Sequence, residues 1–506
     1  MTRQIYKVAS VLLCMQSVLT FEEKKGYFWQ VSDFHYDANY SSHGNPLNMC
    51  HQGQGQGYSN SQYGNYHCDA PWVLIESAIN AMVKFHPYPD FVIWTGDSIP
   101  HVKNSDLDSL KVYENIGNVT LRLKQGFPNT TIYPVLGNHD EYPADHYPNG
   151  STNYYSDILY KSHWHTLLEN NTADEFKTGG YYQGHTKTGL VMVGLNTNLL
   201  FSQDPLTKGT GDPAGQFQWL RRKLSEARSL NKKVILFSHI APGYFEKYQD
   251  LMWFYNDYNN EYIKILQTFN DVIATQVYGH EHTDSFRLVK DSYGEPVDIL
   301  FLSPAVTPWN SSLAGVGANN PGVRLYEYNQ NNGEIINYWQ YFLNLSSVIS
   351  GNPPNWALEY EAKKVYNLTK LQPLEVLALV NSFDNDKFNK LYMKYLQFNS
   401  VSQDVMPYCD ESCVKQHFCA ISELEKSGYQ SCLHGEITTH HPRPHHSTPK
   451  APPKDVPKYM EYVIIGLGAV VLLLFIVIAL ICLKKHRFIP NRYSRFNSNL
   501  ASNPIN

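Results

Sequence analysis

The chain contains 506 residues, with a formal net charge of −5 at pH 7 and 14% aromatic residues. A weakly acidic chain without an arginine-rich or aromatic-platform motif lacks the positive charge that attracts the phosphate backbone of a nucleic acid. Nucleic acid is therefore not an expected partner. The length exceeds that of a usual single domain, and no internal repeat occurs, which excludes a repeat architecture and favours one large unit.

Residues 1–20 are predicted to be a secretory signal peptide. Arg3 and Lys7 are followed by the apolar stretch VASVLLCMQSVLT and then by the polar FEEKK, with cleavage expected near Thr20. About a dozen apolar residues are too few to span a bilayer, which makes an uncleaved anchor the weaker interpretation.

Candidate metal ligands occur in five short segments, and most of these segments follow an apolar run that is typical of a buried strand. The runs read YFWQV, FVIW, IYPVL, VILF and VIATQVY. Open α/β sheets bind ligands just outside the carboxyl ends of their strands, so side chains far apart in sequence can meet there. The candidate ligands are Asp33 and His35, Asp97, Asn138, His239, and His280 with His282.

These residue types predict a site for two divalent metal ions. Two ions about 3.5–4 Å apart need an anionic group between them, and Asp97, in a tight Gly96-Asp97 turn, is the natural bridge. Imidazole, carboxylate and amide ligands suit zinc, manganese or iron, and zinc is the favoured ion. None of the segments contains a cysteine, which argues against a structural zinc site, and the histidines argue against calcium or magnesium. On an extended segment, His280 and His282 would present both imidazoles to one side.

Cysteines and glycosylation sequons agree with an exported chain. Cys50 and Cys68 flank a Gly/Gln-rich loop and are expected to pair. The cluster Cys409, Cys413, Cys419 and Cys432 allows three pairings, which spacing alone does not decide. Sequons predict a glycosylated surface and begin at Asn39, Asn118, Asn129, Asn149, Asn170, Asn310, Asn344 and Asn367.

The C-terminal part of the chain changes character several times. Residues 371–398 carry helix-like apolar spacing, which favours a helical subdomain packed on the core over a partner-binding helix. Residues 434–460 are rich in proline and poor in apolar residues, which predicts an extended stalk.

A membrane span is predicted at residues 461–483. Within it, the apolar run from Tyr462 to Cys482 carries no charge, and Lys484, Lys485 and Arg487 follow, which predicts a type I protein with a cytoplasmic tail at 484–506. The polar tail argues against the alternative, a glycolipid-anchor signal, which would end in its apolar segment. Tyr493 begins a Tyr-x-x-apolar pattern that a sorting adaptor could bind, although such short patterns are common by chance.

Together, the segments resemble a known family. The order Asp-x-His, Gly-Asp, Gly-Asn-His-Asp, an isolated His and Gly-His-x-His is similar to that of calcineurin-like metallophosphoesterases. WQVSDFHYD, GDSIPH and the pair Cys50 and Cys68 resemble the acid sphingomyelinase-like phosphodiesterases, over about residues 25–435. The resemblance implies an α/β fold of two packed β-sheets flanked by helices. It places a catalytic domain at 21–345 and a helical, disulfide-bonded subdomain at 346–433, without the saposin-like domain that acid sphingomyelinase carries.

The resemblance also implies roles for individual residues. One metal would be held by Asp33, His35, Asp97 and His282, and the other by Asp97, Asn138, His239 and His280. A hydroxide activated by the metals would attack phosphorus. His139 would be the general acid or a phosphate ligand, Asp140 would orient its imidazole, and His101 would contact phosphate, the alternative for His101 being a solvated loop histidine. Within the cysteine cluster the implied pairs are Cys409 with Cys413 and Cys419 with Cys432.

We therefore expect a membrane-tethered, extracellular or luminal phosphodiesterase at the cell surface or in an endolysosomal membrane. Because the saposin-like domain is missing, nucleotides or phosphocholine-type molecules are the expected substrates, with sphingomyelin hydrolysis to ceramide and phosphocholine as the alternative. A hypothesis of another class is a catalytically silent stalked receptor or adhesion ectodomain. That hypothesis predicts a lost metal ligand, and no ligand position is lost in the sequence.

Overall fold

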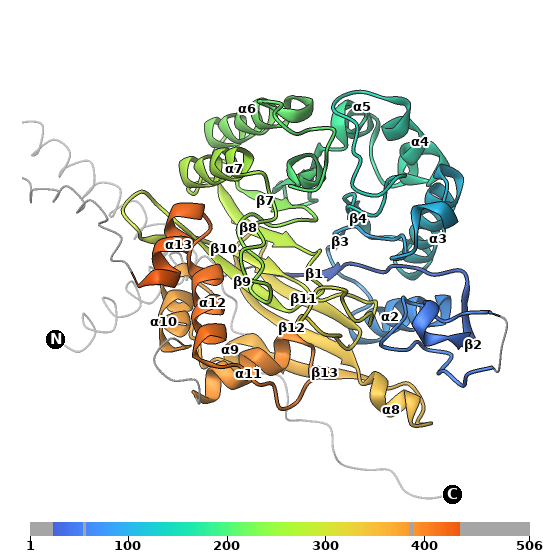
Figure 1. Ribbon diagram of the computed structural model, residues 1–506. Helices are drawn as coiled ribbons and strands as arrows, with labels where there is room; N and C mark the ends of the chain where they lie inside the picture. Colours follow the sequence, from blue (N-terminus) through green and yellow to red (C-terminus); the bar gives the residue numbers. More distant parts are fainter. Residues whose placement is uncertain (1–23, 54–56, 384–388, 436–506) are drawn as a thin grey trace, which may run out of the picture. The chain divides into compact units, whose positions relative to one another are not determined.

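The computed structural model describes residues 24–435, apart from residues 54–56 and 384–388 (Figure 1). The predicted signal peptide, the stalk beyond residue 435, the span 461–483 and the tail with Tyr493 lie outside the described residues. Among the helices of the described ranges, none combines the length and the apolar character needed to cross a bilayer.

Two mixed six-stranded sheets form the framework, as the sequence predicted. The first has the order β13-β12-β11-β1-β3-β4 and the second the order β5-β6-β7-β8-β10-β9. The strands of the first sheet are β1 (Lys25–Val31), β3 (Phe91–Trp94), β4 (Thr131–Pro134), β11 (Gly322–Asn329), β12 (Ile335–Leu343) and β13 (Trp356–Glu361). Those of the second are β5 (Tyr182–His185), β6 (Val191–Gly194), β7 (Val234–Phe237), β8 (Ile273–Tyr278), β9 (Ser285–Lys290) and β10 (Pro296–Leu302). A further strand, β2 (Tyr40–Asn45), belongs to neither sheet.

The apolar runs that precede the candidate ligands all form strands. In the first sheet β1, β3 and β4 are parallel neighbours, and in the second β7 is parallel to both β6 and β8. Parallel neighbours end at the same edge of a sheet, so the residues after β1, β3 and β4 share one edge, and those after β7 and β8 share another. The fold therefore brings the candidate ligands to two adjacent strand edges.

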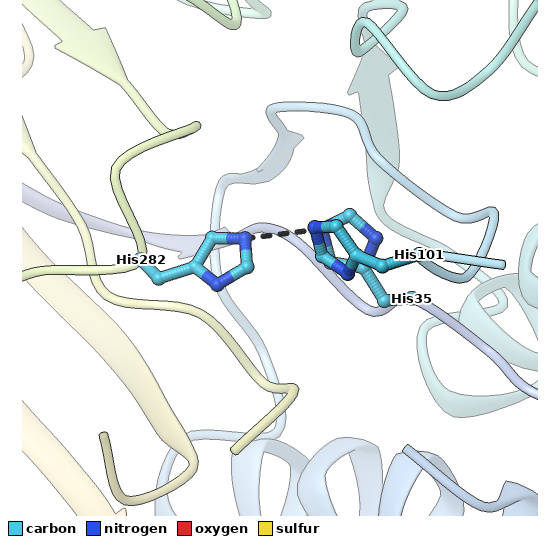
Figure 2. A group of neighbouring side chains, drawn as sticks. All are labelled: His35, His101 and His282. Atoms are coloured by element: carbon cyan, nitrogen blue, oxygen red, sulfur yellow. Dashed lines mark hydrogen bonds between the residues drawn. The ribbon is translucent and has the colours of Figure 1, made fainter. Parts of the chain in front are cut away.

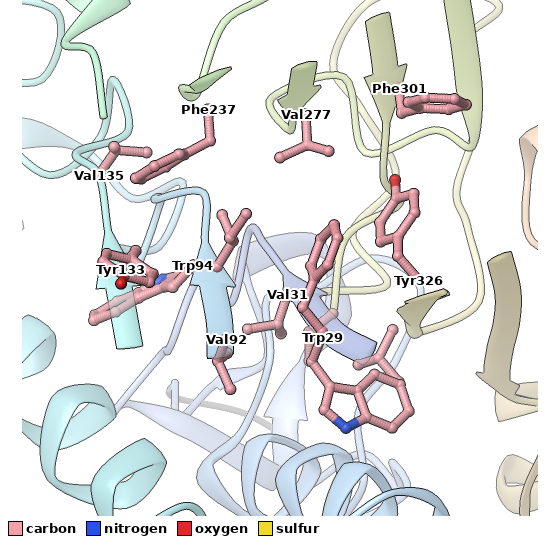
Figure 3. Packing of buried hydrophobic residues seen from close by; sticks show 14 of the residues in the cluster. Trp29, Val31, Val92, Trp94, Tyr133, Val135, Phe237, Val277, Phe301 and Tyr326 are labelled. Carbon is pink, nitrogen blue, oxygen red and sulfur yellow. The ribbon is translucent and has the colours of Figure 1, made fainter. Parts of the chain in front are cut away.

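The two sheets pack against each other through one large apolar core, part of which is shown in Figure 3. The ring centroids of Tyr133 on β4 and Phe237 on β7 are 6.0 Å apart, and those of Phe301 and Tyr326 are 5.9 Å apart. Successive side chains of a strand point to opposite faces, so the side chains of β7 enter two different cores. Ile235 and Phe237 join this core, whereas Val234 and Leu236 face a second core with the helices on the far side of the sheet. A run buried on both faces explains why VILF is continuously apolar.

Helices cover the outer faces of both sheets (Figure 1). Helix α3 begins where the side chain of Asp108 accepts a hydrogen bond from the backbone N–H of Lys111 at 3.0 Å, and it buries a stripe that includes Val112, Ile116 and Leu123. The helices up to residue 365 are α2 (Trp72–Phe85), α3 (Ser109–Gly126), α4 (Asn153–Lys161), α5 (Asn170–Gly179), α6 (Gln216–Ser229), α7 (Asn256–Thr268), α8 (Leu345–Ile349) and α9 (Ala362–Val365).

The C-terminal helices are α10 (Pro373–Phe383), α11 (Lys390–Asn399), α12 (Glu411–Ser422) and α13 (Lys426–His434). Helix α10 contacts β10 and helix α12 contacts β9, so this group covers one edge of the second sheet. Strand β13 lies within the segment expected to be helical, and it pairs with β12 in the first sheet. The disulfides join Cys50 with Cys68, Cys409 with Cys413, and Cys419 with Cys432, which are the expected pairs.

The glycosylation sequons lie on the surface. Every sequon asparagine whose side chain is described is exposed, and the side chain of Asn170 is not described. The exposed asparagines are Asn39, Asn118, Asn129, Asn149, Asn310, Asn344 and Asn367.

Candidate metal centre

The candidate ligands form two groups that share Asp97. The Asp97 carboxylate oxygen Oδ2 lies 3.2 Å from His239 Nε2 and 3.5 Å from His35 Nε2. Asp97 follows β3 of the first sheet, whereas His239 follows β7 of the second. One carboxylate oxygen therefore faces donors from both sheets, as expected for a bridging ligand.

The first group consists of Asp33, His35, Asp97 and His282. His35 Nε2 lies 3.1 Å from His282 Nε2, a contact shown by the dashed line in Figure 2. Asp33 Oδ1 lies 3.9 Å from His35 Nε2 and 3.7 Å from His282 Nε2. These donor atoms converge although His282 comes from the second sheet and the other residues from the first.

The second group consists of Asp97, Asn138, His239 and His280. Asn138 Oδ1 lies 3.0 Å from His239 Nε2 and 2.9 Å from His280 Nδ1, and the two imidazole nitrogens are 3.3 Å apart. The orientation of the Asn138 amide is fixed by Asp145, because Asn138 Nδ2 donates to Asp145 Oδ1 at 2.9 Å. The amide oxygen, which is the atom of an asparagine able to bind a metal, thus faces the histidines.

The hydrogen bonds behind the ligands fit a metal centre. His35 Nδ1 lies 2.6 Å from Ile99 O, and His239 Nδ1 lies 2.6 Å from Thr95 O. A carbonyl oxygen accepts only from N–H, so in the neutral imidazoles each Nε2 carries a lone pair. In the neutral form of His239, its Nε2 and Asn138 Oδ1 are two acceptors 3.0 Å apart, and a metal ion or a proton between them removes their repulsion.

The distances also suit metal ligands. Zinc–nitrogen bonds of about 2.0–2.1 Å at tetrahedral angles place neighbouring donor atoms about 3.4 Å apart. The separations in both groups range from 2.9 to 3.9 Å, on either side of that value. Without a metal, burial opposes charge on His239, but the carboxylates of Asp97 and Asp33 outweigh it and raise its pKa to about 9. Burial lowers the pKa of His35, His280 and His282, so these imidazoles are neutral, as metal ligands have to be.

Several ligands have left-handed backbone conformations, which are unusual for residues other than glycine. Such a conformation costs about 1–3 kcal/mol per residue and is found mainly at functional sites. The positive φ angles are 53° at Asp33, 42° at His35, 55° at Asp97, 72° at His280 and 60° at His282. The segment 280–282 is therefore not extended, and its imidazoles enter different groups instead of pointing to one side.

Asp140 has a different position from the one expected. Its carboxylate accepts hydrogen bonds from the backbone N–H groups of Asp97 and Gly137 at 2.9 Å and of Ser98 at 2.7 Å. These bonds clamp the turn that carries Asp97 instead of orienting the His139 imidazole. The backbone N–H of His139 donates to Asp97 Oδ1 at 2.9 Å, which adds to the same clamp.

His101 lies beside the first group, not in a solvated loop. Its ring centroid is 4.0 Å from that of His35 and 4.5 Å from that of His139. His101 Nδ1 is 3.0 Å from the buried carboxylate of Asp69, and the ring of His101 stacks on Trp309 at 3.8 Å. Neither Asp69 nor Trp309 was predicted from the sequence, because neither belongs to a ligand segment.

A cavity of about 300 Å³ opens over the centre. Asn138, His280 and His282 line it from the two donor groups, and His101 and His139 line it beside them. The other lining residues include the aromatic side chains of Phe201, Phe245, Trp253 and Trp309. The arrangement can bind a small molecule with one anionic group at the metal ligands and two histidines next to it.

Family models match two adjacent parts of the chain. The calcineurin-like phosphoesterase model matches residues 26–284, which include every candidate ligand. The acid sphingomyelin phosphodiesterase C-terminal region model matches residues 295–439.

Curated relatives match most of the chain. Acid sphingomyelinase-like phosphodiesterase 3b of Mus musculus is 38% identical over 417 residues, which cover 81% of this chain and 90% of that protein. Sphingomyelinase phosphodiesterase C of Dictyostelium discoideum is 36% identical over 424 residues, covering 81% and 93%. Cyclic GMP-AMP phosphodiesterase SMPDL3A of Homo sapiens is 34% identical over 411 residues, covering 81% and 90%.

Proposed function

The chain belongs to the acid sphingomyelinase-like phosphodiesterases, which are metal-dependent, and we propose that it hydrolyses phosphodiester or phosphoanhydride bonds of nucleotides. The observation that carries the proposal is the pair of donor groups sharing Asp97 beneath a cavity with two further histidines. One similar protein of Homo sapiens is named a cyclic GMP-AMP phosphodiesterase, which adds support for a nucleotide substrate.

We propose that two zinc ions occupy the centre. Asp33, His35, Asp97 and His282 would hold one ion, and Asp97, Asn138, His239 and His280 the other. When bound, two divalent ions neutralise charge on phosphoryl oxygens and lower the pKa of a water molecule towards neutrality. The left-handed turns hold the ligands in place, so binding requires little rearrangement of the backbone.

The two histidines next to the centre would act on the substrate. Asp69 accepts from His101 Nδ1, which leaves His101 Nε2 to contact a phosphoryl oxygen or to give a proton to the leaving oxygen. His139 lines the same cavity and is the second candidate for the general acid. The stack on Trp309 restricts rotation of the His101 ring, so its Nε2 keeps one direction.

The test is a joint measurement of metal content and turnover on the purified ectodomain. Wild type should bind about two ions per chain and hydrolyse ATP, whereas Asp97→Ala and His239→Ala should lose both metal and turnover. His185→Ala is the matched control, since His185 is an exposed histidine on β5. Full turnover in Asp97→Ala would overturn the proposal, whereas wild type without bound metal or turnover would favour the silent receptor or adhesion module.

Sphingomyelin is the second candidate substrate. It is favoured by the Dictyostelium relative, which is named a sphingomyelinase phosphodiesterase. Wild-type ectodomain assayed side by side on sphingomyelin vesicles and ATP, at acidic and neutral pH, separates the two substrates. Faster hydrolysis of sphingomyelin than of ATP would make sphingomyelin the favoured substrate.

The compartment and the domain boundaries are also proposals. The disulfides suit an oxidising compartment, and the exposed sequons suit glycosylation there. We propose a type I membrane protein of the cell surface or an endolysosomal membrane, with the catalytic domain at 21–345 and the span at 461–483. Glycosidase digestion followed by alkaline carbonate extraction of membranes tests this, and release of the intact chain by carbonate would contradict a span.

A further inference from the structure

Lys247 brings positive charge into the wall of the cavity. Of the residues that line this cavity, all of which are described, Lys247 is the one lysine or arginine. Its ammonium nitrogen Nζ donates to Val316 O at 3.1 Å. An ammonium group has three N–H donors, and within the described residues no carboxylate lies close enough to form an ion pair with it.

The carboxylates nearest to Lys247 have other partners. Glu246 accepts hydrogen bonds from Tyr395 and Asn399 of α11, and Glu281 accepts from Arg287 and from the Trp253 indole. The half-buried ammonium therefore lies near carboxylates that have other partners, and two of its N–H donors are left for a ligand. Burial lowers the pKa of Lys247 to about 8, while Glu246, Asp404 and Glu281 oppose that shift, so the side chain is largely charged at and below neutral pH.

The C-terminal helices hold Lys247 in position. Gln416 Nε2 on α12 donates to the backbone O of Glu246 at 2.8 Å, and Tyr395 OH on α11 donates to the Glu246 carboxylate. Lys247 follows directly in the loop between β7 and α7. The helices thus hold the backbone next to Lys247, and the bond to Val316 O holds its ammonium.

We propose that Lys247 binds a second anionic group of the substrate, separate from the phosphoryl group that is cleaved. This proposal rests on the proposed function and narrows its substrate class to molecules that carry at least two phosphates, such as nucleoside triphosphates. A quaternary ammonium in the same place would be repelled, so the lysine selects against choline-containing substrates. Phe245 and Trp253, which line the same cavity, offer apolar faces for a nucleobase.

The test compares the full ectodomain on substrates that differ in the charge beyond the scissile group. ATP carries further negative charge, bis(4-nitrophenyl) phosphate carries none, and 4-nitrophenyl phosphorylcholine carries a cation. In Lys247→Met, the ratio of kcat/KM for ATP to that for bis(4-nitrophenyl) phosphate should fall roughly tenfold to hundredfold, mainly through KM, because a charge-assisted contact is lost. Lys247→Glu should lower this ratio further, and it should raise the ratio of kcat/KM for 4-nitrophenyl phosphorylcholine to that for bis(4-nitrophenyl) phosphate. Lys247→Arg should keep the preference for ATP.

Controls separate the possible outcomes. Lys264→Met removes an exposed lysine of α7 and should leave all ratios unchanged. Inorganic pyrophosphate should inhibit wild type more strongly than Lys247→Met, which gives a binding readout independent of turnover. An unchanged ATP ratio in Lys247→Met, or an equal loss on all three substrates, would overturn the inference. Wild type without metal-dependent turnover of any substrate would instead overturn the proposed function.

Discussion

His101 and Asp69 form a buried pair at the edge of the metal centre, with His101 Nδ1 3.0 Å from Asp69 Oδ1. The backbone N–H of His101 also donates to Asp69 at 2.6 Å, and Thr307 donates to the same carboxylate at 3.0 Å. Asp69 therefore fixes both the tautomer of the His101 ring and the position of its backbone. This contact joins residues 32 positions apart in the chain and places the Asp69 carboxylate directly beside the His101 ring.

Asp69→Asn should lower kcat roughly 10²-fold or more, because the amide can present an N–H instead of an acceptor to His101 Nδ1 and then no longer fixes the tautomer of the ring. Metal content should remain at the wild-type value, since Asp69 does not reach either donor group. Steady-state kinetics and metal analysis on the same sample check both statements. Asp37→Asn is the matched control, as it changes another aspartate paired with a histidine, His51, outside the cavity. Equal kinetic losses in the two variants would contradict the role given to Asp69.

Gly137→Ala should disrupt the bridging ligand. A Cβ atom at residue 137 would lie 2.0 Å from Asp97 Oδ1 and 2.3 Å from Asp97 N, so the carboxylate has to move. A misplacement of about 1 Å at a reacting centre can cost about 10²-fold in rate, and we expect at least that loss of turnover. Bound metal should fall in parallel. In Gly211→Ala, an added Cβ meets no atom within 4 Å, and that variant should behave as wild type.

Metal removal should lower thermal stability, because each group takes ligands from both sheets. An ion that binds only the folded protein, present at 100 times its Kd, stabilises it by about 2.7 kcal/mol. Calorimetry before and after chelation should therefore show a drop in Tm of at least several degrees, reversed by added zinc. His239→Ala should show no comparable response to the chelator. A chelator-sensitive Tm in that variant would place the stabilising ion elsewhere.

Asp298 should make the protein less stable as pH rises. Burial raises the pKa of this carboxyl to about 7, above the value of about 3.9 expected in an unfolded chain. The folded state therefore holds the proton of Asp298 more tightly than the unfolded chain does. The contribution of this carboxyl to stability is fully present below about pH 4 and is lost as pH rises through about 7.

Asp298→Asn should accordingly raise the free energy of unfolding at pH 7.5 by an amount on the order of 1 kcal/mol or more, with little gain at pH 4.5. The amide can still accept from Gln276 or from the backbone N–H of Ile299. Denaturant unfolding at the two pH values measures the difference. A gain of equal size at both pH values would exclude titration of Asp298 as the cause.

The convergence of the candidate ligands could be predicted from the sequence because each candidate follows a recognisable strand. Asp97 comes two residues after the run FVIW, which is β3. His239 comes one residue after the run VILF, which is β7. Buried strands of this kind have to be apolar throughout, so the polar residue after them stands out. The convergence of the strand ends then follows from parallel pairing within each sheet.

Residues that act through tertiary contacts could not be predicted in this way. Asp69 and Trp309 reach His101 only after loops from different parts of the chain pack together, and neither has a distinctive sequence neighbour. The sequence placed Asp140 beside the His139 ring because the residues are adjacent, but the tight turn directs the carboxylate back to three N–H groups. Strand β13 was missed because Trp356–Glu361 is only partly buried and belongs to an edge strand without a continuous apolar run.

The position of β1 has a consequence for the order of folding during synthesis. β1 is made first of all the strands, yet it lies between β3 and β11, and β11 ends only at Asn329. The edge of β1 that pairs with β11 therefore stays unpaired until the chain has been made as far as β11, a period in which an unpaired strand can associate with another chain. Synthesis of β11 thus ends the period in which β1 can pair with another chain. A chain that stops before residue 322 would contain β1 and the candidate ligands after it, but not the strand that covers this edge of β1.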